Sequence, residues 1–280
     1  MLKKGDTIGL ICCSNGKDLS EKKKIEHLIN VLDTKFQLTC VLTKTLYSTS
    51  NRSPKERAAA LLDLYTNTTV KAIFDLSGGD LANELLPYLN FETIKTYPKP
   101  FIGYSDLTVV LNSIYKKTGL YGINYQLLNI LNGTEEQRLF EDYFFNADKL
   151  PNFYYSWLTY PGVLQTVVIG GNIRCLLKLA GTPYFPDPTN RVLLLEARGG
   201  SLEQIATYLA QLDQMGVLNS CAGILLGQFT SIEERAQTEA LIQLILSYTS
   251  KYNKIVLKTA CIGHSKDSIP FPIGKKISFI

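Results

Sequence analysis

The sequence predicts an α/β fold in which an N-terminal parallel-sheet domain is joined to a smaller C-terminal α/β domain. Short runs rich in β-branched residues alternate with stretches of helical periodicity, an order typical of βαβ units and therefore of parallel sheets. The chain has 280 residues, nearly twice the roughly 150 residues of an average domain. This alternation breaks once, near the middle of the chain, so we expect two domains.

The first half of the chain reads as a Rossmann- or flavodoxin-like succession of strands and helices. Ser20 is a candidate cap for the first helix, whose apolar residues recur with the i, i+3, i+4, i+7 spacing of one helical face. The sequence Ser53-Pro54-Lys55-Glu56 combines a capping box with proline at the first helical position, which predicts the start of the second helix. The expected strands are Thr7–Cys13, Phe36–Leu42, Val70–Leu76 and Lys99–Tyr104, and the last precedes a helix from about Leu107 to Lys117.

A break in the pattern between about Asn146 and Gly162 marks the expected domain boundary. This segment contains two prolines and five aromatic residues without a helical or strand period. We therefore assign residues 1–145 to the N-terminal domain, 146–162 to a linker and 163–280 to the C-terminal domain. There we expect strands at Leu164–Ile169, Arg191–Glu196, Ala222–Leu226 and Lys254–Leu257, and helices near Asn172–Leu179, Leu202–Met215 and Ala236–Tyr252.

The charge and cysteine patterns exclude several classes of protein. The formal net charge is only +4, and the single cationic run, Lys22-Lys23-Lys24, is flanked by glutamates on a helix, so nucleic acid is not an expected partner. No apolar stretch approaches the roughly 18 residues of a membrane span, and the first residues lack a signal-peptide pattern. The six cysteines include no C-x-x-C pair, which disfavours disulfides and a thiolate metal site. We expect a cytoplasmic protein without a membrane partner.

Two glycine pairs follow strands, where backbone N–H groups can approach a ligand. Gly78-Gly79 and Gly170-Gly171 each stand at the end of an expected strand, before a helix whose N-terminus favours negative charge. The alternative for both pairs is a tight turn without a ligand. The two best-known phosphate-binding motifs, G-x-G-x-x-G after a strand and G-x-x-x-x-G-K-[ST], are absent, so the sequence gives little support to a nucleotide cofactor.

The chain has only two histidines, and histidine is the most frequent general base near neutral pH. His27 lies off the apolar stripe of its helix, so we expect it to face solvent without a chemical role. His264 follows a strand-like segment and precedes a loop rich in serine and proline, where it has either a structural or a catalytic role.

Ser105 and Glu196 are the other candidates for chemistry. Ser105 lies between an apolar strand and a helix, the setting of a nucleophile elbow, although Leu107 replaces one glycine of the G-x-S-x-G pattern. The alternative is that Ser105 or Asp106 caps the following helix. Glu196 ends a buried-looking strand, and by itself it could also be a rim carboxylate paired with Arg198.

Three expected strands thus end at or near Ser105, Glu196 and His264. Ligands of open α/β sheets bind outside the carboxyl ends of the strands, so these side chains are expected to converge. A serine nucleophile needs an imidazole to accept its proton, and the imidazole needs an acid that fixes its tautomer. The three residues together predict a serine hydrolase.

Several ordered motifs resemble the LD-carboxypeptidases, serine peptidases that include the microcin C self-immunity peptidases as a branch. The resemblance spans nearly the whole chain. It rests on Ser77-Gly78-Gly79-Asp80 with Asn83 and Leu85–Leu89, Gly103-Tyr104-Ser105-Asp106, Gly170-Gly171-Asn172, Gly181-Thr182-Pro183, Leu195-Glu196, Gly223–Phe229, and Gly263-His264 with Pro270 and Gly274.

The resemblance implies a catalytic triad of Ser105, Glu196 and His264 in a site between the two domains. It also implies an oxyanion hole formed by backbone N–H groups of Asp106 and the Gly78-Gly79 turn. No metal or organic cofactor is expected, and proteins of this family are often homodimers.

The implied reaction is hydrolysis of the bond between an L-centre and a terminal D-residue, which releases D-alanine from cytoplasmic murein tetrapeptides during cell-wall recycling. The partner is then a small peptide substrate. Departures from the family pattern at Asn124, Ala197 and Thr207 leave the substrate open. One alternative is a microcin C-type self-immunity peptidase acting on peptidyl-nucleotides, and another is a non-catalytic α/β ligand-binding protein.

Overall fold

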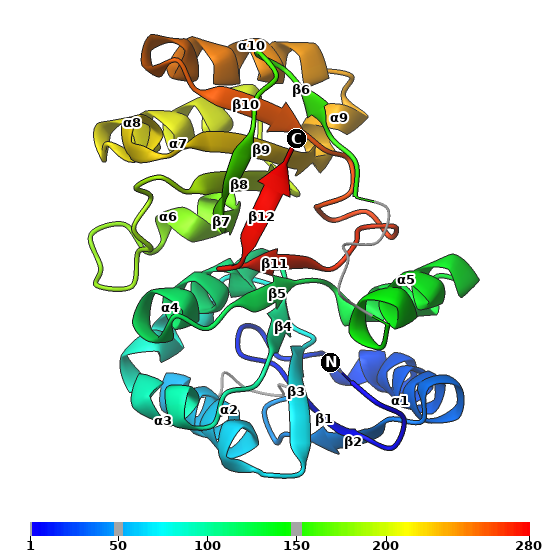
Figure 1. Ribbon diagram of the computed structural model, residues 1–280. Coiled ribbons are helices and arrows are strands. Elements are labelled where there is room, and N and C mark those ends of the chain that lie inside the picture. Colours follow the sequence, from blue (N-terminus) through cyan, green and yellow to red (C-terminus); the bar gives the residue numbers. More distant parts are fainter. Residues whose placement is uncertain (1, 48–52, 147–152) are drawn as a thin grey trace.

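The computed structural model describes residues 2–47, 53–146 and 153–280, and it confirms the predicted α/β architecture (Figure 1). Two six-stranded sheets lie one above the other in Figure 1. The N-terminal sheet has the strand order β11-β5-β4-β3-β1-β2, and the C-terminal sheet has the order β12-β7-β8-β9-β10-β6.

The N-terminal sheet is parallel through its five successive strands β1 to β5. These strands are β1 (Thr7–Ile11), β2 (Thr39–Leu42), β3 (Val70–Asp75), β4 (Phe101–Gly103) and β5 (Gly122–Asn124). Alternate side chains of the strands pack on opposite faces, as the period of a strand requires. One face is covered by α1 (Lys22–Phe36) and α5 (Thr134–Phe144), and the other by α2 (Pro54–Thr66), α3 (Phe91–Thr96) and α4 (Thr108–Thr118). Short 3-10 turns η1 (Leu19–Glu21), η2 (Ala82–Tyr88), η3 (Ser105–Leu107) and η4 (Leu127–Leu131) connect these elements.

The C-terminal sheet has four parallel central strands with antiparallel strands at both edges. The central strands are β7 (Leu164–Asn172), β8 (Val192–Ala197), β9 (Gly223–Phe229) and β10 (Ile255–Lys258). One face packs on the helices α6 (Ile173–Leu177), α7 (Leu202–Gln214), α8 (Val217–Ser220), α9 (Thr230–Glu234) and α10 (Thr238–Thr249), the last of which continues into η5 (Ser250–Tyr252). The opposite face shares one continuous apolar core with α2, α3 and α4 of the N-terminal half. The helix α4 therefore lies against both sheets.

Short strands from distant parts of the chain complete both sheets. After the C-terminal strands, β11 (Phe271–Ile273) runs antiparallel to β5 of the N-terminal sheet, and β12 (Lys276–Phe279) then returns to β7. Figure 1 shows β11 next to β5, on the side of the N-terminal sheet that is nearest the C-terminal sheet. Within the expected linker, β6 (Ser156–Trp157) pairs with β10. Aromatic burial fixes these segments, because the ring of Phe153 packs on those of Phe271 and Phe279.

Two details of the first helix differ from the expectation. The helix α1 begins at Lys22 without a side-chain cap, so Ser20 does not cap it, and Asp18 caps the preceding 3-10 turn η1. Phe36 is the last residue of α1 and buries its ring, so it does not begin the second strand. The predicted capping box at the start of α2 is confirmed, since Ser53 and Glu56 exchange side-chain and backbone hydrogen bonds.

Candidate active site

Ser105 occupies a strained turn between β4 and α4. Its φ angle is +55°, a left-handed value that residues with a side chain rarely adopt. No side-chain cap hydrogen bond is present at either η3 or α4, so the alternative that Ser105 or Asp106 caps the next helix is wrong. A strained strand-to-helix turn that projects a half-buried serine is the geometry of a nucleophile elbow.

Glu196 and His264 form a buried pair at the carboxyl end of the C-terminal sheet. Oε2 of Glu196 lies 2.9 Å from Nδ1 of His264, and the two side chains are 2% and 7% exposed. The atoms are within hydrogen-bonding distance but lack the alignment of a linear hydrogen bond. Nε2 of His264 is also buried and has no hydrogen-bond partner in the part of the chain that the structure describes. Glu196 thus pairs with His264 and not with Arg198, and it is no rim carboxylate.

Contacts between the two halves bring residues on both sides of Ser105 close to this pair. The ring centroid of Tyr104, the residue before Ser105, lies 5.4 Å from that of His264. On the other side, Oγ1 of Thr108 in the first turn of α4 accepts a hydrogen bond of 3.0 Å from the backbone N–H of Asn172. Asn172 is paired in register with Glu196 on the neighbouring strand. The structure therefore gathers all three candidate residues around the junction of the two halves.

The carboxylate of Asp106 is committed to a buried network. Nζ of Lys178 lies 2.5 Å from Oδ1, while Ser14 Oγ and the backbone N–H of Ala82 donate to Oδ2 at 2.6 and 2.9 Å. This ion pair joins two residues that are far apart in the sequence. No pattern in the sequence singled out its lysine. Because the side chain of Asp106 is engaged, the backbone N–H is the part of this residue that can act as an oxyanion donor.

The turn after β3 presents Gly78 and Gly79 at the same edge of the sheet. A Cβ atom added at Gly78 would lie 3.6 Å from the hydroxyl of Tyr104, which places this glycine beside the strained serine turn. The amides that follow are already bonded: those of Asp80, Leu81 and Ala82 donate to Asn15 Oδ1, Ser14 Oγ and Asp106 Oδ2. Gly78 itself pairs with Asn15 in an isolated antiparallel bridge, so within this turn the N–H of Gly79 is the candidate backbone donor for an anion.

The second glycine pair has a different role. Gly170 and Gly171 lie within β7, and Asn112 of α4 exchanges two hydrogen bonds with the backbone of Gly170, at 2.8 and 2.9 Å. Asn112 is fully buried. This pair serves the packing of α4 against the C-terminal sheet, and because β7 runs on to Asn172 it is neither the expected tight turn nor a ligand loop.

The positions that depart from the family pattern lie in different surroundings. Asn124 is buried on β5 and pairs in register with Gly103, two residues before Ser105. Ala197 is buried directly after Glu196, whereas Thr207 is exposed on α7 and bonds only within its own helix. His27 is exposed on α1, as expected.

The cysteine and acidic side chains of the described residues do not form a metal site. All six cysteines are free thiols, and burial raises the pKa of the Cys40 and Cys175 thiols to about 12. Among the described residues, no group of three or more His, Cys, Asp or Glu side chains is placed to hold a metal ion. No described helix is long and apolar enough to cross a membrane.

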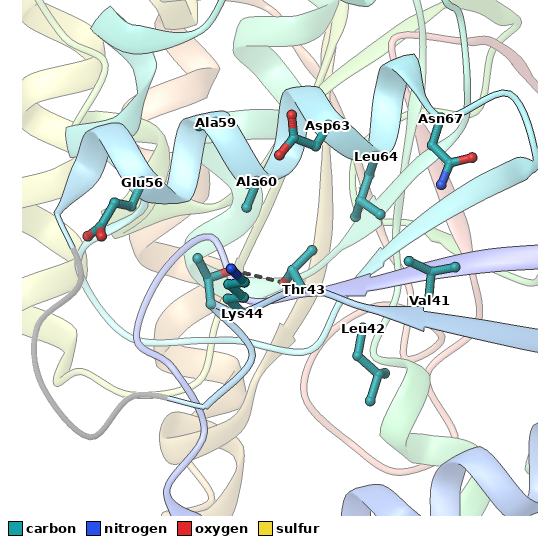
Figure 2. A pocket seen from close by; sticks show the side chains of 11 residues that line it. Val41, Leu42, Thr43, Lys44, Glu56, Ala59, Ala60, Asp63, Leu64 and Asn67 are labelled. Carbon is teal, nitrogen blue, oxygen red and sulfur yellow. Dashed lines mark hydrogen bonds between the residues drawn. The ribbon is translucent and has the colours of Figure 1, made fainter.

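A pocket of about 410 Å³ lies away from these residues, between the end of β2 and one face of α2 (Figure 2). Lys44, Glu56 and Asp63 are the charged residues of its lining, and the rest is apolar or uncharged. None of the candidate catalytic residues lines this pocket. This pocket is therefore separate from the candidate site at the junction of the two halves.

Known proteins match the chain over nearly its whole length. A model of the LD-carboxypeptidase N-terminal domain matches residues 8–125, and a model of the C-terminal domain of the same family matches residues 165–279. A probable murein peptide carboxypeptidase of Bacillus subtilis (strain 168) is 29% identical, with 98% of this chain and 89% of that protein covered. The microcin C7 self-immunity protein MccF of Escherichia coli is 26% identical, with 98% and 90% covered.

Solved structures agree with these sequence relationships. The crystal structure of an MccF-like protein from Bacillus anthracis str. Ames superposes with a TM-score of 0.87 at 25% identity, and the match covers 99% of this chain and 94% of that one. Both halves of the molecule and the order of the motifs thus match one family of peptidases. This chain belongs to the LD-carboxypeptidase family.

Proposed function

We propose that this protein is a cytoplasmic serine carboxypeptidase that hydrolyses an L–D peptide bond with Ser105, Glu196 and His264, releasing terminal D-alanine from murein tetrapeptides. The observation that supports it best is the buried pair of Glu196 and His264 beside a serine held at a positive φ angle. Family membership supports peptide hydrolysis, and the relative named as a murein peptide carboxypeptidase supports the substrate class.

In the proposed reaction, Oγ of Ser105 attacks the scissile carbonyl while Nε2 of His264 accepts its proton. Glu196 faces Nδ1, which keeps the proton of the neutral imidazole on that atom and stabilises the imidazolium that forms. His264 then donates the proton to the leaving amine. A water molecule activated by the same imidazole hydrolyses the acyl-enzyme and regenerates Ser105.

Backbone amides would stabilise the oxyanion in this reaction. The N–H of Asp106 follows the nucleophile directly, and Gly78 of the Gly78-Gly79 turn lies beside the hydroxyl of Tyr104. Fixed donors of this kind act where charge develops, and one of them is worth on the order of 10²–10³ in rate. A metal ion has no part in this mechanism, so activity should survive EDTA.

Mass spectrometry of a murein tetrapeptide incubated with the protein tests this proposal. Loss of one D-alanine is the expected result, and Ser105→Ala or His264→Ala should lower kcat on the order of 10⁴–10⁶-fold, because triad members act as a unit. His27→Ala is the matched control and should leave kcat unchanged. A Ser105→Ala variant that keeps more than a tenth of wild-type activity would contradict the proposed nucleophile.

A peptidyl-nucleotide is the second candidate substrate, since the sequence similarity to the self-immunity protein MccF covers 98% of this chain. Structures of that protein hold aspartyl sulfamoyl adenosine and glutamyl sulfamoyl guanosine. Offering the tetrapeptide and aspartyl sulfamoyl adenosine to the same preparation separates the two substrates by their kcat/KM values.

A fluorophosphonate separates both enzymes from a non-catalytic ligand-binding protein. The reagent should label Ser105 in an enzyme and should label no specific residue in a binding protein. Amidation of the peptide's terminal carboxylate provides a further test of the carboxypeptidase assignment. It should reduce kcat/KM by about 1.5–3 kcal/mol, the worth of a hydrogen bond to a charged group.

A further inference from the structure

His264 lies in a segment without regular secondary structure, and a single buried side chain spans it. Gln228, near the end of β9, is 8% exposed. Its Nε2 donates to the backbone oxygen of Ala260 at 2.6 Å and to Oγ of Ser265 at 2.5 Å. Its Oε1 accepts from the backbone N–H of Ser265 at 3.0 Å. The amide group of Gln228 therefore bonds the loop on both sides of His264.

Backbone contacts bring the loop against the same strand. The N–H of Gln228 donates to the oxygen of Ile262 at 2.8 Å. A Cβ atom added at Gly227 would lie 2.6 Å from that oxygen and 3.0 Å from Cβ of Glu196, so only glycine permits this approach. A Cβ atom added at Gly263 would lie 2.5 Å from Oε1 of Gln228. Both glycines fit the loop closely around the glutamine side chain and beside Glu196.

We propose that Gln228 is a positioning residue, which holds the loop from Ala260 to Ser265 so that Nδ1 of His264 faces Glu196 and Nε2 faces the serine turn. The inference rests on the proposed function, in which His264 is the general base. The backbone oxygen of Ala260 needs a hydrogen-bond donor, and the backbone N–H of Ser265 needs an acceptor. A primary amide supplies both from one side chain. Methionine or leucine fills the same space without either bond, and glutamate cannot donate to Ala260.

The kinetic test compares Gln228→Met with Gln137→Met. Gln137 on α5 also donates its amide to a backbone carbonyl, that of Ile130 at 2.9 Å, but lies outside the candidate site, so it is a matched control. Displacement of a catalytic group by about 1 Å costs on the order of 10²-fold in rate. We expect Gln228→Met to lower kcat about 10–100-fold with KM within about threefold of wild type, and Gln137→Met to change neither.

A second readout reports the imidazole directly. The chain has only two histidines. Nitrogen NMR spectra of protein labelled with ¹⁵N-histidine therefore contain one set of signals from His264 and one set from exposed His27. For the neutral imidazole of His264 we expect one tautomer, protonated at Nδ1, in wild type and a mixture of tautomers in Gln228→Met. The His27 signals should stay unchanged.

Unaltered His264 signals and an unaltered kcat in a folded Gln228→Met protein would overturn the proposed role. Should that variant fail to fold, Ser265→Ala removes only one of the three side-chain contacts and should give a smaller loss of kcat with the same mixture of tautomers. An unaltered Ser265→Ala protein would then count against the proposal. If wild type neither cleaves peptides nor reacts with a fluorophosphonate while Gln228→Met still changes the His264 tautomer, the proposed function fails and the positioning role stands.

Discussion

The two glycine pairs have the same appearance in the sequence and opposite surroundings in the structure. Gly78-Gly79 follows β3 at the carboxyl end of the sheet, where a Cβ atom at Gly78 would meet only the Tyr104 hydroxyl, at 3.6 Å, and a Cβ atom at Gly79 would meet the side chain of Asn15. Gly170-Gly171 lies inside β7, where a Cβ atom at Gly170 would lie 2.3 Å from the backbone oxygen of Leu194. The comparison shows that the neighbouring segments, and not the glycine pair itself, determine whether such a segment can accept a ligand.

The two segments are also held by different kinds of contact. Buried Asn112 and Thr108 hydrogen-bond the backbone of β7 around Gly170-Gly171. The turn at Gly78-Gly79 is instead fixed from its rim by Asn15 and by a partly exposed ion pair between Asp80 and Arg174. Buried hydrogen bonds are costly to break, whereas exposed ion pairs contribute little. This difference predicts that substitutions at the tightly packed, buried positions change the protein more than substitutions at the exposed ones.

Gly170→Val should have the largest effect, on folding. The φ angle of +101° and the approach of Leu194 leave no room for a side chain, so we expect a loss of about 3 kcal/mol or more from positive-φ strain and overpacking. Urea unfolding followed by circular dichroism measures this. An unchanged midpoint would mean that β7 and β8 can separate at this position.

Gly79→Val should damage catalysis more than folding. The φ angle is +119° and a Cβ atom would lie 2.0 Å from Oδ1 of Asn15, so the turn must shift, and with it the proposed oxyanion donors. We expect kcat to fall about 100-fold, the effect of losing one such donor. Gly78→Ala is the control, because its Cβ atom makes an ordinary contact. If Gly79→Val keeps wild-type kcat, this turn does not take part in the reaction.

Asn112→Leu should have an intermediate effect on stability. It leaves the N–H and the oxygen of Gly170 without their buried partner, which costs about 1–3 kcal/mol. Chemical unfolding of the variant and wild type measures the difference, and equal stabilities of the two proteins would exclude this contact as a tie between the halves.

Asp80→Asn should have the smallest effect. The hydrogen bond and charge of Arg174 lower the pKa of Asp80 below its ordinary value, and the carboxylate is 63% exposed. The stabilisation is then complete above the unfolded pKa of about 3.9 and is lost as the pH falls through the lowered folded value. Exposed pairs of this kind contribute at most about 1 kcal/mol. Thermal unfolding should show wild type slightly more stable at pH 7 and equal to the variant at low pH, and a difference that grows on acidification would contradict the assigned sign.

Lys178 illustrates why part of the site could not be predicted from the sequence. Lys178 is 72 residues away from Asp106 along the chain, yet its Nζ lies 2.5 Å from Oδ1 of Asp106. Nothing in the spacing or type of the lysines distinguishes it from the others. Similarly, the partner of β5 is β11, almost 150 residues later, and its three residues carry too short a pattern to predict a strand.

The sequence by itself determined the alternation of strands and helices, the capping box of α2 and a short set of candidate residues. These depend on local periodicity, on hydrogen bonds between residues three apart, and on the presence of only two histidines. The tertiary structure decided that Glu196 faces His264, that Gln228 spans the loop around it, and that Gly78 has room for a side chain while Gly170 has none. Each of these depends on close approach between distant segments, and a glycine has the same local sequence signal whether its missing side chain faces solvent or the backbone of Leu194.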